Sequence, residues 1–123
     1  MDEYPPVVVI GAAAMDTKGR AHSALSPATS CGGDIRISVG GSARNVAENL
    51  ARLGVPTTMF TAVGEDESGR RILNQARESG IDVDHVMATD EYHTAAYMSI
   101  YDEEGKPVYS IHDMEILSLI TPQ

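Results

Sequence analysis

The chain has 123 residues, with nine lysines and arginines against eighteen aspartates and glutamates, and 42% of its residues are hydrophobic. This length corresponds to about one domain, and the formal net charge of −9 argues against a surface for nucleic-acid phosphates or an anionic membrane. The single cysteine, Cys31, excludes an internal disulfide and a zinc site built from cysteines. With no apolar run long enough to span a bilayer, a cytoplasmic location is expected.

The first half of the chain alternates strand-like and helix-like segments. Residues 7–10 form a short Val/Ile run that predicts a buried strand, and residues 57–63 predict a second one. Between them, residues 16–33 are small, polar and turn-forming, whereas residues 34–39 alternate as a strand with one buried face does. This order favours an α/β fold with a parallel sheet and flanking helices.

Two helices are predicted from the spacing of apolar residues. In the first, residues 43–53, Ser42 fits the N-cap and Gly54 the closing residue. The second helix begins after the N-cap Asp66 and closes at Gly80. The apolar side chains expected on the buried face of the first helix are Ala43, Val46, Ala47, Leu50 and Ala51.

Two glycines, Gly40 and Gly41, precede the first helix and predict a binding corner. Glycine lets the main chain approach a ligand closely, and the first helical N–H groups have no intrahelical acceptor. Arg44 and Asn45 are expected beside these N–H groups, where an oxygen-rich ligand would fit. The alternative interpretation is a loop with no binding role.

The second half of the chain predicts a β-hairpin. Residues 94–101 and 107–112 alternate apolar and polar side chains around a turn at residues 102–106. With residues 34–39 they could form a small antiparallel sheet that covers a cleft as a lid. Alternatively, the hairpin extends the main sheet.

An ordered set of motifs spans nearly the whole chain: Val8-Val9-Ile10-Gly11, Asp16, Gly40-Gly41, Asn45, Leu50-Ala51-Arg52-Leu53-Gly54 and Val63-Gly64-Glu65-Asp66-Glu67-Ser68-Gly69. This set resembles the ribokinase-like (PfkB) sugar and nucleoside kinases. Within that family, the Arg44-Asn45 pair, the strand from Thr94 and the stretch from Ile111 look most like pseudouridine kinases. Asp66 and Gly69 match a family turn, although an N-cap and a tight turn explain both residues.

The resemblance implies a ribokinase-like three-layer core, truncated here, and a small β-sheet lid. It places the lid strands at about residues 17–39 and 94–113, and the core at about residues 5–16 and 40–93. It further implies phosphoryl transfer from ATP, with Mg²⁺ and, as a further ion, K⁺, to a ribosyl hydroxyl. The 5′-hydroxyl of pseudouridine is the favoured acceptor, and ribokinase or another carbohydrate kinase is the alternative.

By the same resemblance, Asp16 would accept hydrogen bonds from sugar hydroxyls, and the backbone of Gly40 and Gly41 with the Asn45 amide would hold others. Many family members have asparagine where this chain has Ala14. Four lid residues are also expected over the substrate, and among them Asp113 is expected to contact the nucleobase: Thr94, Tyr97, Met98 and Asp113.

No catalytic residue is expected in this chain, because the family's Gly-Ala-Gly-Asp segment with its base aspartate does not occur in it. The 123 residues alone are therefore expected to be inactive. Thr121 and Pro122 have the form of a helix start and suggest part of a longer chain.

The expected partners are a sugar or nucleoside and a second copy bound through the lid, without nucleic acid, membrane or metal ligands. The alternative of another class is a non-catalytic nucleoside-binding or dimerisation module. A dinucleotide-binding domain is disfavoured, because residues 11–16 lack the Gly-x-Gly-x-x-Gly spacing.

Overall fold

The structure is a computed structural model that describes residues 4–122. Five short strands form the α/β core: β1 (Val7–Ile10), β4 (Thr57–Phe60), β5 (Ala62–Gly64), β6 (Ile81–Asp82) and β7 (Met87–Thr89). β1, β4 and β6 pair in that order in one parallel sheet, and β5 pairs with β7 in a second parallel pair. The expectation of an α/β fold with parallel strands is therefore confirmed.

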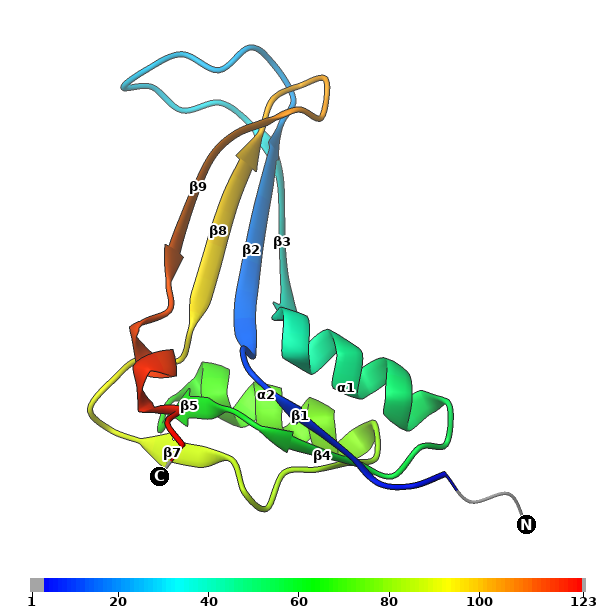
Figure 1. Ribbon diagram of the computed structural model, residues 1–123. Coiled ribbons are helices and arrows are strands. Elements are labelled where there is room, and N and C mark those ends of the chain that lie inside the picture. Colours follow the sequence, from blue (N-terminus) through cyan, green and yellow to red (C-terminus); the bar gives the residue numbers. More distant parts are fainter. Residues whose placement is uncertain (1–3, 123) are drawn as a thin grey trace.

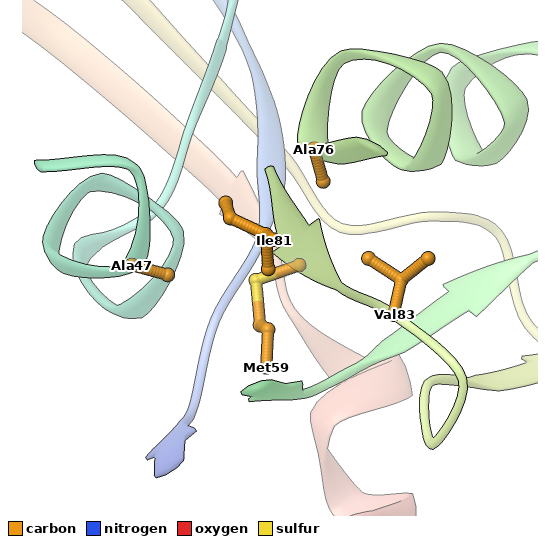
Figure 2. Close-up of a cluster of buried hydrophobic side chains, with 5 residues drawn as sticks. All are labelled: Ala47, Met59, Ala76, Ile81 and Val83. Atoms are coloured by element: carbon orange, nitrogen blue, oxygen red, sulfur yellow. The ribbon is translucent and has the colours of Figure 1, made fainter. Parts of the chain in front are cut away.

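Helices α1 (Ser42–Arg52) and α2 (Glu67–Glu78) pack on the same face of the β1-β4-β6 sheet. Figure 2 shows the cluster between them, in which small alanines let the helices approach the strands closely. Its buried members are Ala47 of α1, Met59 of β4, Ala76 of α2, Ile81 of β6 and Val83, which follows β6. Val8 and Ile10 are exposed on the other face of the sheet.

A separate four-stranded sheet, the lid, rises from the core (Figure 1). Its strands are β2 (Ala14–Ala21), β3 (Gly33–Gly40), β8 (Ala96–Tyr101) and β9 (Pro107–Asp113), in the order β3-β2-β8-β9. The β2–β3 and β8–β9 pairs are antiparallel, but β2 and β8 are parallel. The lid is thus mixed rather than antiparallel, and the alternative that the hairpin extends the main sheet is wrong.

Two strand expectations are corrected. The expected polar stretch at residues 16–33 is a strand in its first part, because β2 pairs on both sides and its long polar side chains point to solvent. The single strand expected at residues 57–63 divides at Thr61 into β4 and β5, which belong to different sheets.

The ends of the helices follow the sequence signals in part. The Asp66 carboxylate caps α2 by accepting from the Gly69 N–H at 2.8 Å, as expected, and Gly54 and Gly80 have positive φ. Ser42 is not the N-cap of α1, however. Gly41 occupies that position, and no side chain caps this helix.

Other expectations about the helices also differ from the structure. Val46 is 51% exposed, because α1 turns Arg44 toward the core instead. After β9, a short 3₁₀ helix, η1 (Glu115–Leu119), packs Ile116 against Ala62 and Ala95, and residues 120–122 are not helical.

The turn from β3 into α1 depends on Gly41. Its φ of +99° is unfavourable for residues with a side chain, and a Cβ there would lie 2.5 Å from the Ala12 carbonyl oxygen. The segment that connects β1 to β2 and the segment that connects β3 to α1 can therefore cross closely only because residue 41 is a glycine.

We expect Gly41→Ala to lower the free energy of unfolding by about 3 kcal/mol, because strain in φ adds to overlap with the backbone. Gly54→Ala is the matched control: Gly54 also has positive φ (+85°), but a Cβ there meets open space, so its cost is about 1 kcal/mol. Denaturant unfolding measures both. Equal losses for the two variants would contradict the role assigned to the close crossing.

Candidate functional site

The Asp16 carboxylate lies directly over Gly40. Ala14 of β2 pairs with Gly40 of β3, so Asp16, two residues further along β2, leans back over the glycine. A Cβ on Gly40 would overlap the carboxylate and lie 2.7 Å from its Cγ. Gly40 thus makes room for the half-buried carboxylate beside the start of α1.

The first turn of α1 offers hydrogen-bond donors at the same place. The Arg44 N–H donates to Ala12 O and the Asn45 N–H to Gly41 O. Among the described residues, the N–H groups of Gly41, Ser42 and Ala43 donate no backbone hydrogen bond. The Asn45 side chain is exposed, so donors and the Asp16 acceptor meet at an open corner.

The Arg44 side chain, which was expected at this corner, does not line it, because it is buried on the side of α1 that faces the core. It is 4% exposed, and its Nη1 lies 2.9 Å from Glu48 Oε2. Glu48 also accepts from Arg52 at 3.0 Å. Partial burial would raise the pKa of Glu48, but the hydrogen bond from Arg52 and the positive charges of Arg44 and Arg52 lower it.

Strand alternation divides the expected lid contacts between two faces. Tyr97 is the partner of Asp16 in the β2–β8 register, so both side chains lie on the same face of the lid. Met98 is one residue further along β8 and projects from the opposite face. Asp113 pairs with Ala96 and therefore also belongs to the face opposite Asp16.

The structure thus brings together Asp16, Gly40, Gly41, Asn45 and, along the lid, Tyr97. It does not bring Met98 or Asp113 to them. Met98 is 51% exposed, and Asp113 lies at the end of β9.

Thr94 has a structural role that the sequence pattern did not reveal. Its hydroxyl donates to Asp66 Oδ1 at 2.6 Å and accepts from the Gly64 N–H at 2.8 Å, while its own N–H donates to Asp66 Oδ2 at 3.0 Å. Thr94 precedes lid strand β8, and Asp66 caps α2 in the core. The cap therefore also fixes the base of the lid, and a contact between Thr94 and substrate stays a prediction.

These bonds change the ionisation of Asp66. Partial burial would raise its pKa, but the hydrogen bonds from the Thr94 hydroxyl, the Thr94 N–H and the Gly69 N–H, together with the charge of His93, outweigh burial and lower it.

Ala14 is fully buried against Ala62, Ala95 and Ile116. Position 14, where many members of the family have asparagine, therefore supplies no polar side chain to the corner in this chain.

Cys31 is free and exposed in the segment between β2 and β3, as expected of a loop residue.

Within residues 4–122 no group of three or more histidine, cysteine, aspartate or glutamate side chains is placed to hold a metal ion. No helix of that part is long and apolar enough to cross a membrane.

The arrangement suits a ligand rich in hydroxyl groups. A carboxylate accepts two hydrogen bonds at once, and the neighbouring N–H groups donate to the ligand's oxygens.

Residues 5–122 match the family described as pfkB family carbohydrate kinase. The chain belongs to this family.

Proteins similar to the chain include both nucleoside and sugar kinases. Pseudouridine kinase of Escherichia coli (strain K12) is 38% identical over 123 residues, 100% of this chain and 39% of that protein. Guanosine-inosine kinase of Exiguobacterium acetylicum is 34% identical over 99 residues, 80% of this chain and 33% of that protein.

The fold is also found among solved structures. A crystal structure of a putative sugar kinase from Clostridium perfringens has a TM-score of 0.86 and 34% identity, and covers 98% of this chain and 38% of that chain. The ribokinase-like fold expected from the sequence is thus confirmed. The chain spans about a third to two fifths of the length of these three proteins.

We expect Asp66→Asn to flatten the acid side of the stability curve. Asp66 binds its proton more weakly when folded, since its pKa lies below the ordinary 3.8. Its stabilisation is complete above that value and is lost as pH falls through the folded pKa. At pH 7 the variant should lose about 2 kcal/mol, because an amide NH₂ cannot accept from the Thr94 N–H.

Denaturant unfolding between pH 7 and pH 2.5 measures this effect. Asp90→Asn changes an exposed carboxylate in the neighbouring turn and should retain the wild-type curve. An unchanged acid slope in Asp66→Asn would show that another group causes the loss.

Proposed function

We propose that the chain is the substrate-binding and lid part of a kinase that transfers the γ-phosphoryl group of ATP to a ribosyl hydroxyl. Pseudouridine, phosphorylated to pseudouridine 5′-phosphate, is the favoured substrate, and ribose or another family sugar is the alternative. The observation that carries the proposal is the position of the Asp16 carboxylate over Gly40, beside the free N–H groups of α1.

The corner can orient a sugar by binding hydroxyls other than the one that receives the phosphoryl group. Asp16 would accept from two neighbouring hydroxyls, and the N–H groups at Gly41 and the Asn45 amide would donate to ligand oxygens. Such positioning is a large part of phosphoryl-transfer catalysis, because little covalent chemistry is left to the protein. Tyr97, on the same lid face as Asp16, would flank the ligand.

The similar proteins support a nucleoside as substrate. Two of them are named for nucleosides, pseudouridine in one and guanosine and inosine in the other. The first is 38% identical to this chain over its whole length, and the second is 34% identical over 80% of it. Met98 and Asp113 are outside the proposed pocket, because they lie on the other lid face.

The proposal assigns no catalytic base, nucleotide site, Mg²⁺ ligand or K⁺ ligand to these residues. The Gly-Ala-Gly-Asp segment that would carry the base does not occur in the sequence. We therefore expect the 123-residue chain alone to bind substrate but not to phosphorylate it.

We also propose that two copies pair through the lid. The register of β3, β2, β8 and β9 places six exposed apolar residues on one face, which we call the apolar lid face: Ile35, Ile37, Met98, Ile100, Tyr109 and Ile111. Contiguous apolar surface of this kind usually marks an interface. The six residues lie opposite Asp16, so pairing there would leave the proposed pocket open.

We expect Asp16→Asn to weaken pseudouridine binding at least about tenfold, because a charge-assisted acceptor is replaced by an amide. Asp34→Asn is the matched control: Asp34 lies on the same lid face as Asp16 but farther from Gly40, and its substitution should change the dissociation constant less than about twofold. Isothermal titration calorimetry measures both. Absence of binding by the wild-type protein, or equal effects of the two variants, would contradict the proposal.

For the dimer, we expect Ile37→Lys and Ile111→Lys each to shift sedimentation equilibrium toward monomer, because a charge would be buried in the apolar interface. Leu53→Lys alters an apolar residue at the end of α1 that is as exposed as Ile111 (72% for both), and it should leave the distribution unchanged. A wild-type protein that stays monomeric at about 1 mM, where an interface of this kind should hold, would rule out this pairing.

A further inference from the structure

The guanidinium of Arg44 is buried, although not all of its donors have a hydrogen-bond partner. Its Nη1 donates to Glu48 Oε2 at 2.9 Å and to Asn45 Oδ1 at 3.1 Å. Its Nε is buried and has no hydrogen-bond partner among the described residues. An unpartnered buried donor lowers stability, so the arrangement is costly in folding terms alone.

The contact with Asn45 fixes which way that amide faces. A guanidinium has only donors, so the group that faces it must be the amide oxygen. The amide NH₂ then points away from Arg44, and the Asn45 side chain is exposed at the corner. Asn45 can thus offer a ligand two N–H donors, while its oxygen is already used by Arg44.

Arg44 is itself held in place along α1. Glu48 accepts from Arg44 through Oε2 and from Arg52 through Oε1, and Ser79 Oγ lies 3.4 Å from the same Oε1. The carboxylate is largely buried, with 18% of its side chain exposed, so the Arg44–Glu48 pair is shielded from water. A shielded pair of this kind gives the guanidinium one preferred position.

We propose that Arg44 is a positioning residue that makes Asn45 a hydrogen-bond donor to the ligand. This inference rests on the proposed function and specifies the polarity of its pocket. Asp16 accepts, and Asn45 donates. The pocket therefore selects a sugar with two neighbouring hydroxyls that give their protons to Asp16 and with a ligand oxygen that accepts from Asn45, and a sugar that lacks one of these groups should bind poorly.

Asn45→Asp tests the polarity directly. The aspartate has the same shape and still accepts from Arg44, so the fold is kept, but it offers no N–H to the ligand. We expect the dissociation constant for pseudouridine to rise at least about tenfold, as in Asn45→Ala. Amide chemical-shift titration of the ¹⁵N-labelled protein gives the constants. Wild-type affinity in Asn45→Asp would overturn the inference.

A double-mutant cycle tests whether Arg44 acts through Asn45. Arg44→Met should weaken binding about threefold to tenfold when Asn45 is present, and less than about twofold in the Asn45→Ala protein. Arg52→Met, which removes the other cationic partner of Glu48, is the matched control and should leave the affinity within about twofold of wild type. Arg44→Leu, which also lacks a donor, replaces Arg44→Met in the cycle if the methionine variant does not fold.

The outcomes separate this inference from the proposed function. If Arg44→Met weakens binding equally with and without Asn45, Arg44 has only a structural role and the inference fails, while the proposed function stands. If the wild-type protein shows no shift with pseudouridine or ribose, both fail. Non-additive effects confined to the Arg44–Asn45 pair, with Arg52→Met silent, support the inference.

Discussion

The close crossing of two chain segments at Gly40 and Gly41 is the constraint on which the rest of the site depends. Gly40 leaves room for the Asp16 carboxylate, and Gly41 lets the chain turn into α1 against the Ala12 carbonyl. Side chains at either position would separate β2 from the helix start. One acceptor and several backbone donors therefore meet because two residues have no Cβ.

This corner joins the two parts of the molecule. β2 begins in the core beside Gly40 and continues as a central strand of the lid, and β8 starts where Thr94 is bonded to the N-cap of α2. The carboxylate of Asp66 thus serves a helix and the lid at once. The close crossing at Gly41 and the hydrogen bonds from Thr94 to Asp66 connect the lid to the core, and Figure 1 shows the lid strands rising from that core.

Local signals in the sequence predicted much of this arrangement. Asp66, Gly54 and Gly80 marked helix ends correctly, because capping and positive φ depend on neighbouring residues. The adjacency of Gly40, Gly41 and Asn45 could also be predicted, since it lies within one turn of chain. The hairpin turn was predictable for the same reason, with Asp102 accepting from the N–H groups of Glu104 and Lys106.

What the sequence missed depends on pairing between distant residues. β2 contains Lys18 and Arg20 and does not show the pattern of a buried strand, because the lid face that carries these two side chains is open to solvent there. The placement of Met98 and Asp113 away from Asp16 follows from the β2–β8 and β8–β9 registers, which no local pattern gives. The spacing of apolar residues also predicted Val46 on the buried face of α1. In the structure Val46 is exposed, and the paired side chains of Arg44 and Glu48 lie on the face toward the core instead.

The central claim is that a ribosyl ligand binds at the start of α1 with its hydroxyls on Asp16. A crystal structure of the protein with pseudouridine tests it most directly. The account predicts two ribose hydroxyl oxygens within about 3 Å of the Asp16 carboxylate, with Asn45 Nδ2 and the N–H groups near Gly41 facing ligand oxygens. A nucleoside bound elsewhere, or bound here with Asp16 turned away, would contradict the account.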